Sequence, residues 1–370
     1  MEARAPYGAL TAVKIPDKDS IMAYKVALYP GDGVGPEVIA EARRVLEALP
    51  ASFEFTLFDW NSSLYASTGR CAPRDYLDRL MPFDAILLGA LGDASKAPDH
   101  IAVEPLLSMR KGFDQYVNIR PTFLYDGVDC PLKNIAPGQI DMVVIRENTE
   151  GEYTDLGGRH YVGTPHEAAM QVNYFTRMGT ERIIRYAFET ARKRERRHLT
   201  SITKSNALKY SMVFWDSVLA DVAKDYPDVT CAPMLVDAAA MNFVRSPGMF
   251  DVVVCSNLFG DILTDIAAII VGGMGFAGSA NINPTRRYPS MFEPVHGSAP
   301  DIAGTGKANP IAAILSAAMM CEFLGEVELA GRVRNAVRAN LAGGRVRTPD
   351  RGGHDSTSAV GNDIIKKLQG

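Results

Sequence analysis

The chain has 370 residues, of which 47% are hydrophobic and 22% charged, and its net charge is −4 at pH 7. This composition excludes a disordered chain and fits one large or two medium globular domains. Acidic and basic residues are interleaved, which argues against a nucleic-acid partner and favours a small molecule. The five cysteines are scattered and show no C-x-x-C spacing, which is typical of reduced thiols in a cytoplasm.

The N-terminal segment, residues 1–21, lacks the apolar core of a secretory signal. Its acids Glu2, Asp17 and Asp19 disfavour a transit peptide. We therefore expect an extension without globular structure on a cytoplasmic protein. The longest apolar stretch, residues 266–275, falls below the ~18 residues that a membrane span needs, so no membrane partner is expected.

Short β-branched runs alternate with segments of helical periodicity along the rest of the chain. Strands are predicted over residues 25–29, 53–58, 84–89, 141–146, 201–204 and 251–256. Helices are predicted over residues 36–49, 178–194, 207–223, 310–324 and 327–342. This alternation predicts an α/β fold in which helices cover an open, partly parallel sheet.

Polar residues follow three of the predicted strands. Arg146 follows the run DMVVI, Lys204 follows SIT, and Asp261 comes shortly after DVVVC. In open α/β sheets, ligands bind in the crevice outside the carboxyl ends of the strands. The sequence therefore predicts that these groups meet in one crevice.

The stretch SNLFGDILTD, residues 256–265, places Asp261 and Asp265 one turn apart if it is helical. Two acids near a helix start could simply complement the helix dipole. Carboxylates this close repel each other unless a cation lies between them, and oxygen ligands without His or Cys select Mg²⁺ or Mn²⁺. Asp237, where another apolar run meets a helix, is a third candidate ligand.

Three arginines, Arg110, Arg120 and Arg146, lie at the ends of apolar segments. Single arginines are mostly surface residues, but three of them opposite a metal would clamp a small dicarboxylate. Lys204 is a candidate base and Tyr153 a candidate proton donor. Taken singly, these two signals are weak, because tyrosines in such loops mostly serve packing.

The glycine-rich stretch YPGDGVGPE, residues 29–37, has the spacing G-x-G-x-G-P and lacks the third glycine of a dinucleotide-binding fingerprint. A second loop, residues 292–310, is more suggestive. It offers ring and backbone donors at His296, Gly297, Ser298 and Ala299. Asp301 could accept hydrogen bonds from a ribose, as acids do in NAD sites, although a structural omega loop is an alternative.

Six motifs together resemble the β-decarboxylating hydroxyacid dehydrogenases, which include isocitrate, isopropylmalate, homoisocitrate, tartrate and D-malate dehydrogenases. In chain order they are GDGVGPE, R-x9-RP, RENTEGEY, TKSNAL, SNLFGDILTD and EPVHGSAPDIAGTGKANP, spanning about Lys25 to Leu324. The segments FDQYVNIRP, RENTEGEYTDLGGR and TKSNAL most resemble the tartrate and D-malate branch.

The resemblance implies the open-sheet fold of isocitrate and isopropylmalate dehydrogenases, which is not a Rossmann domain. It implies a large cofactor-side domain over residues 22–118 and 275–370 and a small central domain over 119–274. The small domain would form a homodimer whose active sites are shared between subunits.

The resemblance also implies roles for particular residues. Arg110, Arg120 and Arg146 would hold the malate moiety, and Tyr153 would protonate the enol. Asp261 and Asp265 would bind Mn²⁺ or Mg²⁺, completed by Asp237 and Lys204 from the other subunit. The cofactor side would comprise Glu293, His296, Gly297, Ser298, Ala299, Asp301 and Asn309. Asp301 would repel the 2′-phosphate of NADP, so NAD is favoured, and a monovalent cation such as K⁺ is a further candidate.

The implied reaction is NAD- and metal-dependent oxidative decarboxylation of D-malate to pyruvate and CO₂, oxidation of tartrate, or both. Glu104 should disfavour the third carboxylate of isocitrate. Leu106 and Leu107 keep 3-isopropylmalate dehydrogenase of leucine biosynthesis as an alternative. A non-catalytic regulatory subunit is the alternative of another class, and the presence of every catalytic group argues against it.

Overall fold

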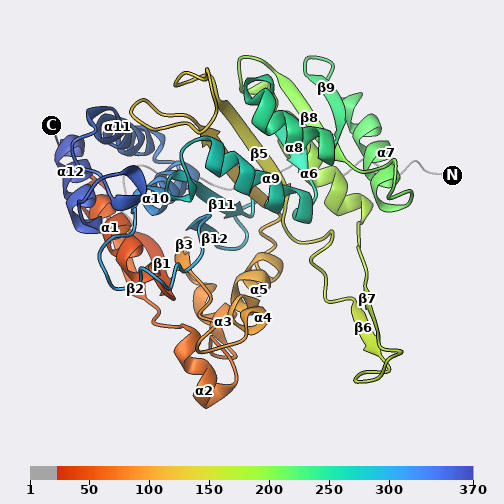
Figure 1. Ribbon diagram of the computed structural model, residues 1–370, viewed down its shortest axis with the longest axis horizontal. Helices are drawn as coiled ribbons and strands as arrows, with labels where there is room; N and C mark the ends of the chain where they lie inside the picture. The colour runs from red at the N-terminus through yellow and green to blue at the C-terminus, as the bar shows by residue number, and fades with distance from the viewer. Residues whose placement is uncertain (1–22, 370) are drawn as a thin grey trace.

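The computed structural model describes residues 23–369 and is built around one ten-stranded sheet (Figure 1). Its strand order is β2-β1-β3-β12-β11-β4-β5-β10-β8-β9. These strands are β1 (Tyr24–Gly31), β2 (Phe53–Leu57), β3 (Ala85–Ala90), β4 (Val117–Phe123), β5 (Asp141–Glu147), β8 (His198–Thr203), β9 (Thr230–Leu235), β10 (Val252–Cys255), β11 (Gly278–Ile282) and β12 (Ser290–Pro294). The extension predicted over residues 1–21 lies outside the described residues.

Helices pack on the sheet, as the alternating pattern predicts. They are α1 (Gly35–Glu47), α2 (Tyr65–Thr68), α3 (Tyr76–Leu80), α4 (Asp99–Ala102), α5 (Glu104–Gly112), α6 (Arg177–Arg192), α7 (Ser211–Ala223), α8 (Val236–Arg245), α9 (Asn257–Ile270), α10 (Ile311–Leu324), α11 (Val327–Gly343) and α12 (Thr357–Gln369). The α/β class and each predicted strand and helix are confirmed, with ends shifted by a few residues. No helix among residues 23–369 is both long and apolar enough to span a membrane.

The sheet consists of two parallel blocks joined by an antiparallel centre. Strands β2, β1, β3 and β12 pair in parallel, as do β5, β10, β8 and β9. Between these blocks, β12, β11, β4 and β5 pair antiparallel. Strands β2, β1, β3, β12 and β11 come from residues 24–90 and 278–294, whereas β4, β5, β10, β8 and β9 come from residues 117–255. Because the sheet is continuous, the division into two domains stays a prediction.

The loop after β1 is hydrogen-bonded to the loops that follow β2, β3 and β12. The buried carboxylate of Asp32 accepts hydrogen bonds from the backbone N and Oγ of Ser62 and the N of Gly92, at 2.8–2.9 Å. The N of Val34 donates to the O of Ser298 at 2.8 Å. Gly33 has φ +59°, and a Cβ there would lie 1.9 Å from the O of Ser298. The GDGVGPE turn therefore packs loops together, as its poor match to a dinucleotide fingerprint suggests.

A two-stranded hairpin, β6 (Gly157–His160) and β7 (Ala168–Gln171), projects away from the body of the molecule (Figure 1). Its root follows the RENTEGEY segment at the end of β5. Large apolar side chains on it are solvent-exposed, including Tyr161, Val162 and Met170. The hairpin therefore adds no core to this chain and leaves these apolar side chains exposed to solvent.

Candidate active site

A cleft of about 580 Å³ lies beside the carboxyl ends of β3, β5 and β12. Eight of the predicted site residues line it: Arg110, Arg120, Arg146, Tyr153, Asp261, Glu293, His296 and Gly297. These residues are spread over nearly two hundred positions of the sequence. Of the three polar groups predicted to meet in one crevice, Arg146 and Asp261 line this cleft and Lys204 does not.

Three arginines of the cleft are buried. Arg110 ends α5, Arg120 lies on β4 and Arg146 lies near the end of β5, with relative exposures of 5%, 6% and 1%. Burial lowers the pKa of Arg110, and burial together with Arg146 lowers the pKa of Arg120 to about 10. Both guanidinium groups remain charged at neutral pH. Buried cations are unfavourable without anionic partners, so this cluster is prepared for anions.

Two carboxylates partly neutralise the arginines. Glu293 lies 2.9 Å from Arg110 and also accepts a hydrogen bond from the Nδ2 of Asn281 at 2.7 Å. Asp261 forms an ion pair with Arg146 and lies 3.7 Å from an Nη2 of Arg120. The resemblance assigned Glu293 to the cofactor side, whereas the structure also places it as the partner of a substrate-side arginine.

Asp261 also holds Tyr153. The Tyr153 hydroxyl donates to the Oδ2 of Asp261 at 2.8 Å, and burial followed by the charge of Asp261 raises the pKa of Tyr153 to about 12. Burial acts to raise the pKa of Asp261, but Arg146 and Arg120 outweigh it, and the pKa falls below the ordinary value. At neutral pH the tyrosine is therefore a proton donor and the aspartate is ionised.

Helix α9 carries both predicted metal acids. Glu152 caps its start, accepting from the Oγ of Ser256 at 2.7 Å and from the N of Leu258 at 3.0 Å. Asp261 lines the cleft, whereas Asp265 lies on an exposed face of the helix. Burial and repulsion by Asp261 raise the pKa of Asp265, and no side-chain hydrogen bond offsets this within residues 23–369. The carboxylates of Asp261 and Asp265, one turn apart, supply oxygen ligands of the kind that a hard divalent cation prefers.

Two further predicted residues lie apart from the cleft. Asp237 begins α8, and its Oδ1 accepts from the Nζ of Lys204 at 2.9 Å. The side chain of Lys204 is 29% exposed. Across residues 23–369, no three His, Cys, Asp or Glu residues are grouped to hold a metal ion. Three carboxylates therefore do not meet within one chain, and the roles of Lys204 and Asp237 stay predictions.

The remaining cofactor candidates, Ser298, Ala299, Asp301 and Asn309, follow β12 outside the cleft lining. Ala299 has a positive φ of 41°. Asn309 donates to Asp350 at 2.9 Å and accepts from the N of Ile311 at 3.1 Å, which caps α10. Burial lowers the pKa of His296, so its ring is neutral at neutral pH. The loop is shaped by its own packing, and the structure leaves its cofactor role a prediction.

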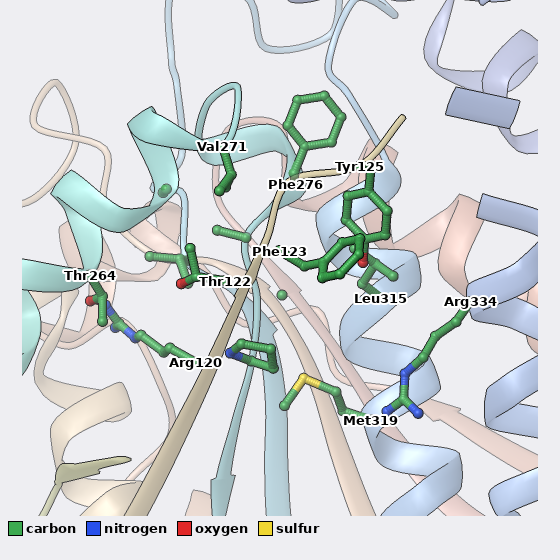
Figure 2. Close-up of a pocket in the computed structure, with 15 residues that line it drawn as sticks. Arg120, Thr122, Phe123, Tyr125, Thr264, Val271, Phe276, Leu315, Met319 and Arg334 are labelled. Atoms are coloured by element: carbon green, nitrogen blue, oxygen red, sulfur yellow. The ribbon is translucent and has the colours of Figure 1, made fainter. Parts of the chain in front are cut away.

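A second, smaller cavity of about 70 Å³ lies on the other side of Arg120 (Figure 2). Figure 2 shows the Arg120 side chain running toward Thr264 on α9, and Arg120 donates to the Oγ1 of Thr264 at 2.5 Å. The other walls are mostly apolar, with Phe123, Tyr125 and Phe276 among them. Arg120 and Val295 line both cavities.

Sequence reasoning missed part of the cleft wall. Apolar side chains cover one side: Leu88, Leu91, Val103, Leu106 and Leu107. Leu106 and Leu107 were recognised through their position before Arg110, whereas the other three resemble ordinary core residues in the sequence. Glu104 is exposed and does not line the cleft, so it does not contact a ligand there.

Comparison with known proteins agrees with this site. The isocitrate/isopropylmalate dehydrogenase family model matches residues 25–364. A tartrate dehydrogenase/decarboxylase from Pseudomonas putida is 48% identical over 357 residues, covering 93% of this chain and 98% of the relative. D-malate dehydrogenase (decarboxylating) from Escherichia coli strain K12 is 47% identical over 353 residues, covering 92% and 98%. The crystal structure of isocitrate dehydrogenase from Methylococcus capsulatus gives a TM-score of 0.85 at 35% identity, covering 94% of this chain and 100% of that one.

Removing the charge of Asp261 should destabilise the protein in a pH-dependent way. Because the pKa of Asp261 is lowered in the folded state, its charge contributes stability above about pH 4, and this stability is lost as the pH falls further. Asp261→Asn should therefore unfold at lower urea than wild type at pH 7, and the gap should close below about pH 4. Asp155→Asn, at a carboxylate that is 98% exposed, should show no such gap. A gap that is constant with pH would contradict the assignment.

Proposed function

This chain belongs to the isocitrate/isopropylmalate dehydrogenase family of oxidoreductases, and we propose that it catalyses the NAD- and divalent-metal-dependent oxidative decarboxylation of D-malate, the oxidation of tartrate, or both. The observation that carries this proposal is the convergence of three buried arginines with Asp261 and Glu293 in one cleft. The likeness to tartrate and D-malate dehydrogenases inferred from the motifs is confirmed by the identity of the relatives. Their named substrates support the same choice here.

The charges of the cleft favour a small dianion. Three guanidinium groups are clustered with Glu293 and Asp261. The other two carboxylates of the lining are engaged elsewhere, Glu152 at the start of α9 and Asp155 with Lys111. Engagement of Asp261 by a divalent cation would make the cleft more positive. Planar guanidinium groups bind carboxylates in a bidentate manner, so the cleft suits a substrate with two carboxylates.

The apolar wall supports a second candidate. Leu106, Leu107 and Val103 would contact a substituent on the substrate, and an alkyl group would bury apolar surface there. This observation favours 3-isopropylmalate over isocitrate, whose third carboxylate would meet leucines. Because Glu104 lies outside the cleft, discrimination against isocitrate depends on these apolar residues.

The residues of this chain suit metal and cofactor binding as follows. Asp261 and Asp265 would hold the divalent cation, and the loop over residues 296–301 with Asn309 would hold the adenosine side of NAD. When bound, the metal supplies Lewis-acid stabilisation of a developing oxyanion, and NAD supplies the hydride acceptor. The exposed carboxylate of Asp301 would repel a 2′-phosphate and so favour NAD over NADP. For a monovalent cation such as K⁺, no residues are assigned.

Proton transfer is the task of Tyr153 and Lys204. Asp261 fixes the hydroxyl of Tyr153 at 2.8 Å, and the raised pKa of the tyrosine, about 12, keeps its proton available. Tyr153 would deliver this proton to the carbon that has lost CO₂. Lys204 of the partner subunit would accept the proton of the 2-hydroxyl group. The arginines orient the carboxylates so that these transfers occur over short distances.

A homodimer would complete the site. The exposed face of α9 carries Asp265 between Ile262 and Ile269, each of which is 53% exposed. Helix α8 packs against α9 and exposes Met241 and Val244 by 64% and 49%. A contiguous apolar face of this kind marks an interface. A second copy placed there would bring its Lys204 and Asp237 toward Asp265. The two-domain division and a cytoplasmic location remain part of the proposal.

The substrate is tested by NADH formation with purified protein, NAD and Mn²⁺, comparing D-malate, tartrate, 3-isopropylmalate and isocitrate. We expect the highest kcat/KM with D-malate or tartrate and the lowest with isocitrate. A preference for 3-isopropylmalate would support the second candidate, in which the apolar wall binds the alkyl group of the substrate. No activity with all four would contradict the proposed reaction and favour a non-catalytic binding role.

Tyr153→Phe should slow protonation after decarboxylation by about 10²-fold or more, because it removes the proton donor but no charge. Hydride transfer should slow much less, so keto-acid intermediate should leave the enzyme. Stopped-flow NADH formation and CO₂ release, measured together, separate the two steps. Tyr161→Phe, on the exposed hairpin, is the control. Equal loss of both steps in Tyr153→Phe would refute its role as an acid.

Shared sites predict complementation between inactive variants. Lys204→Ala and Asp261→Asn should each lose about 10²-fold or more in kcat as homodimers. A co-expressed heterodimer of the two carries both lesions in one site and none in the other, so activity should return. In the control heterodimer of Asp261→Asn with Tyr153→Phe, both sites carry a lesion and activity should stay low. Equal activities in the two heterodimers would place Lys204 in its own chain's site.

A further inference from the structure

The first turn of α9 holds Arg146 along the length of its side chain. The Oδ1 of Asn257 accepts from the Nε and Nη2 of Arg146 at 3.1 and 2.6 Å. Asp261 accepts from the Nη1 at the other edge of the guanidinium group. Gly260 leaves room between them, because a Cβ there would lie 2.6–2.9 Å from the Cβ, Cγ and Cδ of Arg146. One turn of α9, from Asn257 to Asp261, therefore fixes the direction of the Arg146 guanidinium group.

Asn257 is itself held in place. It is 3% exposed, and its Nδ2 donates to the backbone O of Glu150 at 3.1 Å. Because the amide nitrogen has its own acceptor, the amide oxygen is the atom that faces Arg146. Glu152 fixes the start of the same helix through Ser256 and Leu258. The acceptor for Arg146 is thus preorganised by the RENTEGEY segment that also carries Arg146.

The two partners of Arg146 differ in what they can do during the proposed reaction. Asp261 already holds Tyr153 through one oxygen and Arg146 through the other. A divalent cation at Asp261 would compete with both of these partners. Asn257 is neutral, and its amide is hydrogen-bonded to Arg146 and to the backbone O of Glu150. We expect it to keep these bonds whether or not a metal is bound.

We propose that Asn257 is a positioning residue that keeps Arg146 aimed at a substrate carboxylate when Asp261 turns to the metal. This inference rests on the proposed function, because it uses Asp261 as a metal ligand and Arg146 as a substrate ligand. Asn257 acts through Arg146 and does not contact the substrate. Its loss should therefore weaken dicarboxylate binding more than it slows the chemical steps.

Steady-state kinetics with D-malate, NAD and Mn²⁺ test this directly. Asn257→Ala removes two hydrogen bonds to a charged group and should raise KM for D-malate by about tenfold or more. The value of kcat should change by less than about threefold, because the groups that move protons remain. Asn257→Asp restores an acceptor oxygen and should bring KM back toward wild type. Asn362→Ala, which also removes an Asn acceptor from an arginine, Arg44, is the matched control outside the cleft.

Calorimetry without NAD gives a readout that does not depend on turnover. The Kd of Mn²⁺ alone should be the same in Asn257→Ala and wild type, whereas the Kd of D-malate in the presence of Mn²⁺ should rise about tenfold. The same measurements are made with tartrate, and wild type that binds and oxidises neither D-malate nor tartrate would contradict the proposed function. Wild type that does both, with unchanged KM and Kd in a folded Asn257→Ala, would overturn the inference alone.

A purely structural role would have a different outcome. It would lower the unfolding midpoint, kcat and Mn²⁺ affinity together, and this result would also overturn the inference. If Asn257→Ala does not fold, the KM values of Asn257→Asp and Asn257→Gln test the proposal instead. The oxygen of glutamine is displaced by one methylene and should raise KM more than aspartate does. Aspartate keeps an acceptor oxygen for Arg146 but sets its second oxygen against the backbone O of Glu150. Equal KM values would refute the positioning role.

Discussion

The carboxylate of Asp261 is the point on which the electrostatics of the cleft depend. Three buried guanidinium groups cannot share a small volume without anions, and Asp261 contacts two of them directly. The same carboxylate accepts a hydrogen bond from the hydroxyl group of Tyr153. In the proposed reaction Asp261 would also bind the metal. Binding of the cation would therefore free Arg120 and Arg146 from Asp261 to bind the substrate.

The sheet makes this convergence possible. Because β4, β5, β11 and β12 pair antiparallel at the centre, residues from distant parts of the chain lie on adjacent strands. Arg120, Arg146 and Glu293 lie on three of these four strands. Buried amides cross-link them, since Asn281 donates to Glu293 and accepts from Asn118 and Asn148. These bonds to Asn281 tie the strands together, although the Oδ1 atoms of Asn118 and Asn148 have no hydrogen-bond partner among residues 23–369.

Much of the architecture could be predicted from the sequence, because β-branched runs and helical periods report local burial. Strands β4, β6, β7, β9, β11 and β12 were not predicted. Among them, β4 and β11 carry Arg120, Pro121 and Asn281, which do not resemble residues of a buried strand. The arginine cluster and the acids of α9 could be predicted from their positions after apolar segments. The role of Glu293 at Arg110 and that of Asn257 at Arg146 could not, because each pair joins residues more than a hundred positions apart.

The site that one chain builds is electrostatically incomplete. Asp261 faces three arginines and has a lowered pKa, whereas Asp265, one turn further on, has a raised pKa and faces outward between two exposed isoleucines. Helix α9 therefore lines the cleft on one side and exposes an apolar face on the other, and the exposure of that face to water is unfavourable. Covering that face with a second copy would bury the isoleucines and remove water from Asp265, which is tolerable only if a cation joins the two carboxylates. Assembly and metal binding would then stabilise each other, so a change on the outer face of α9 should also alter the cleft.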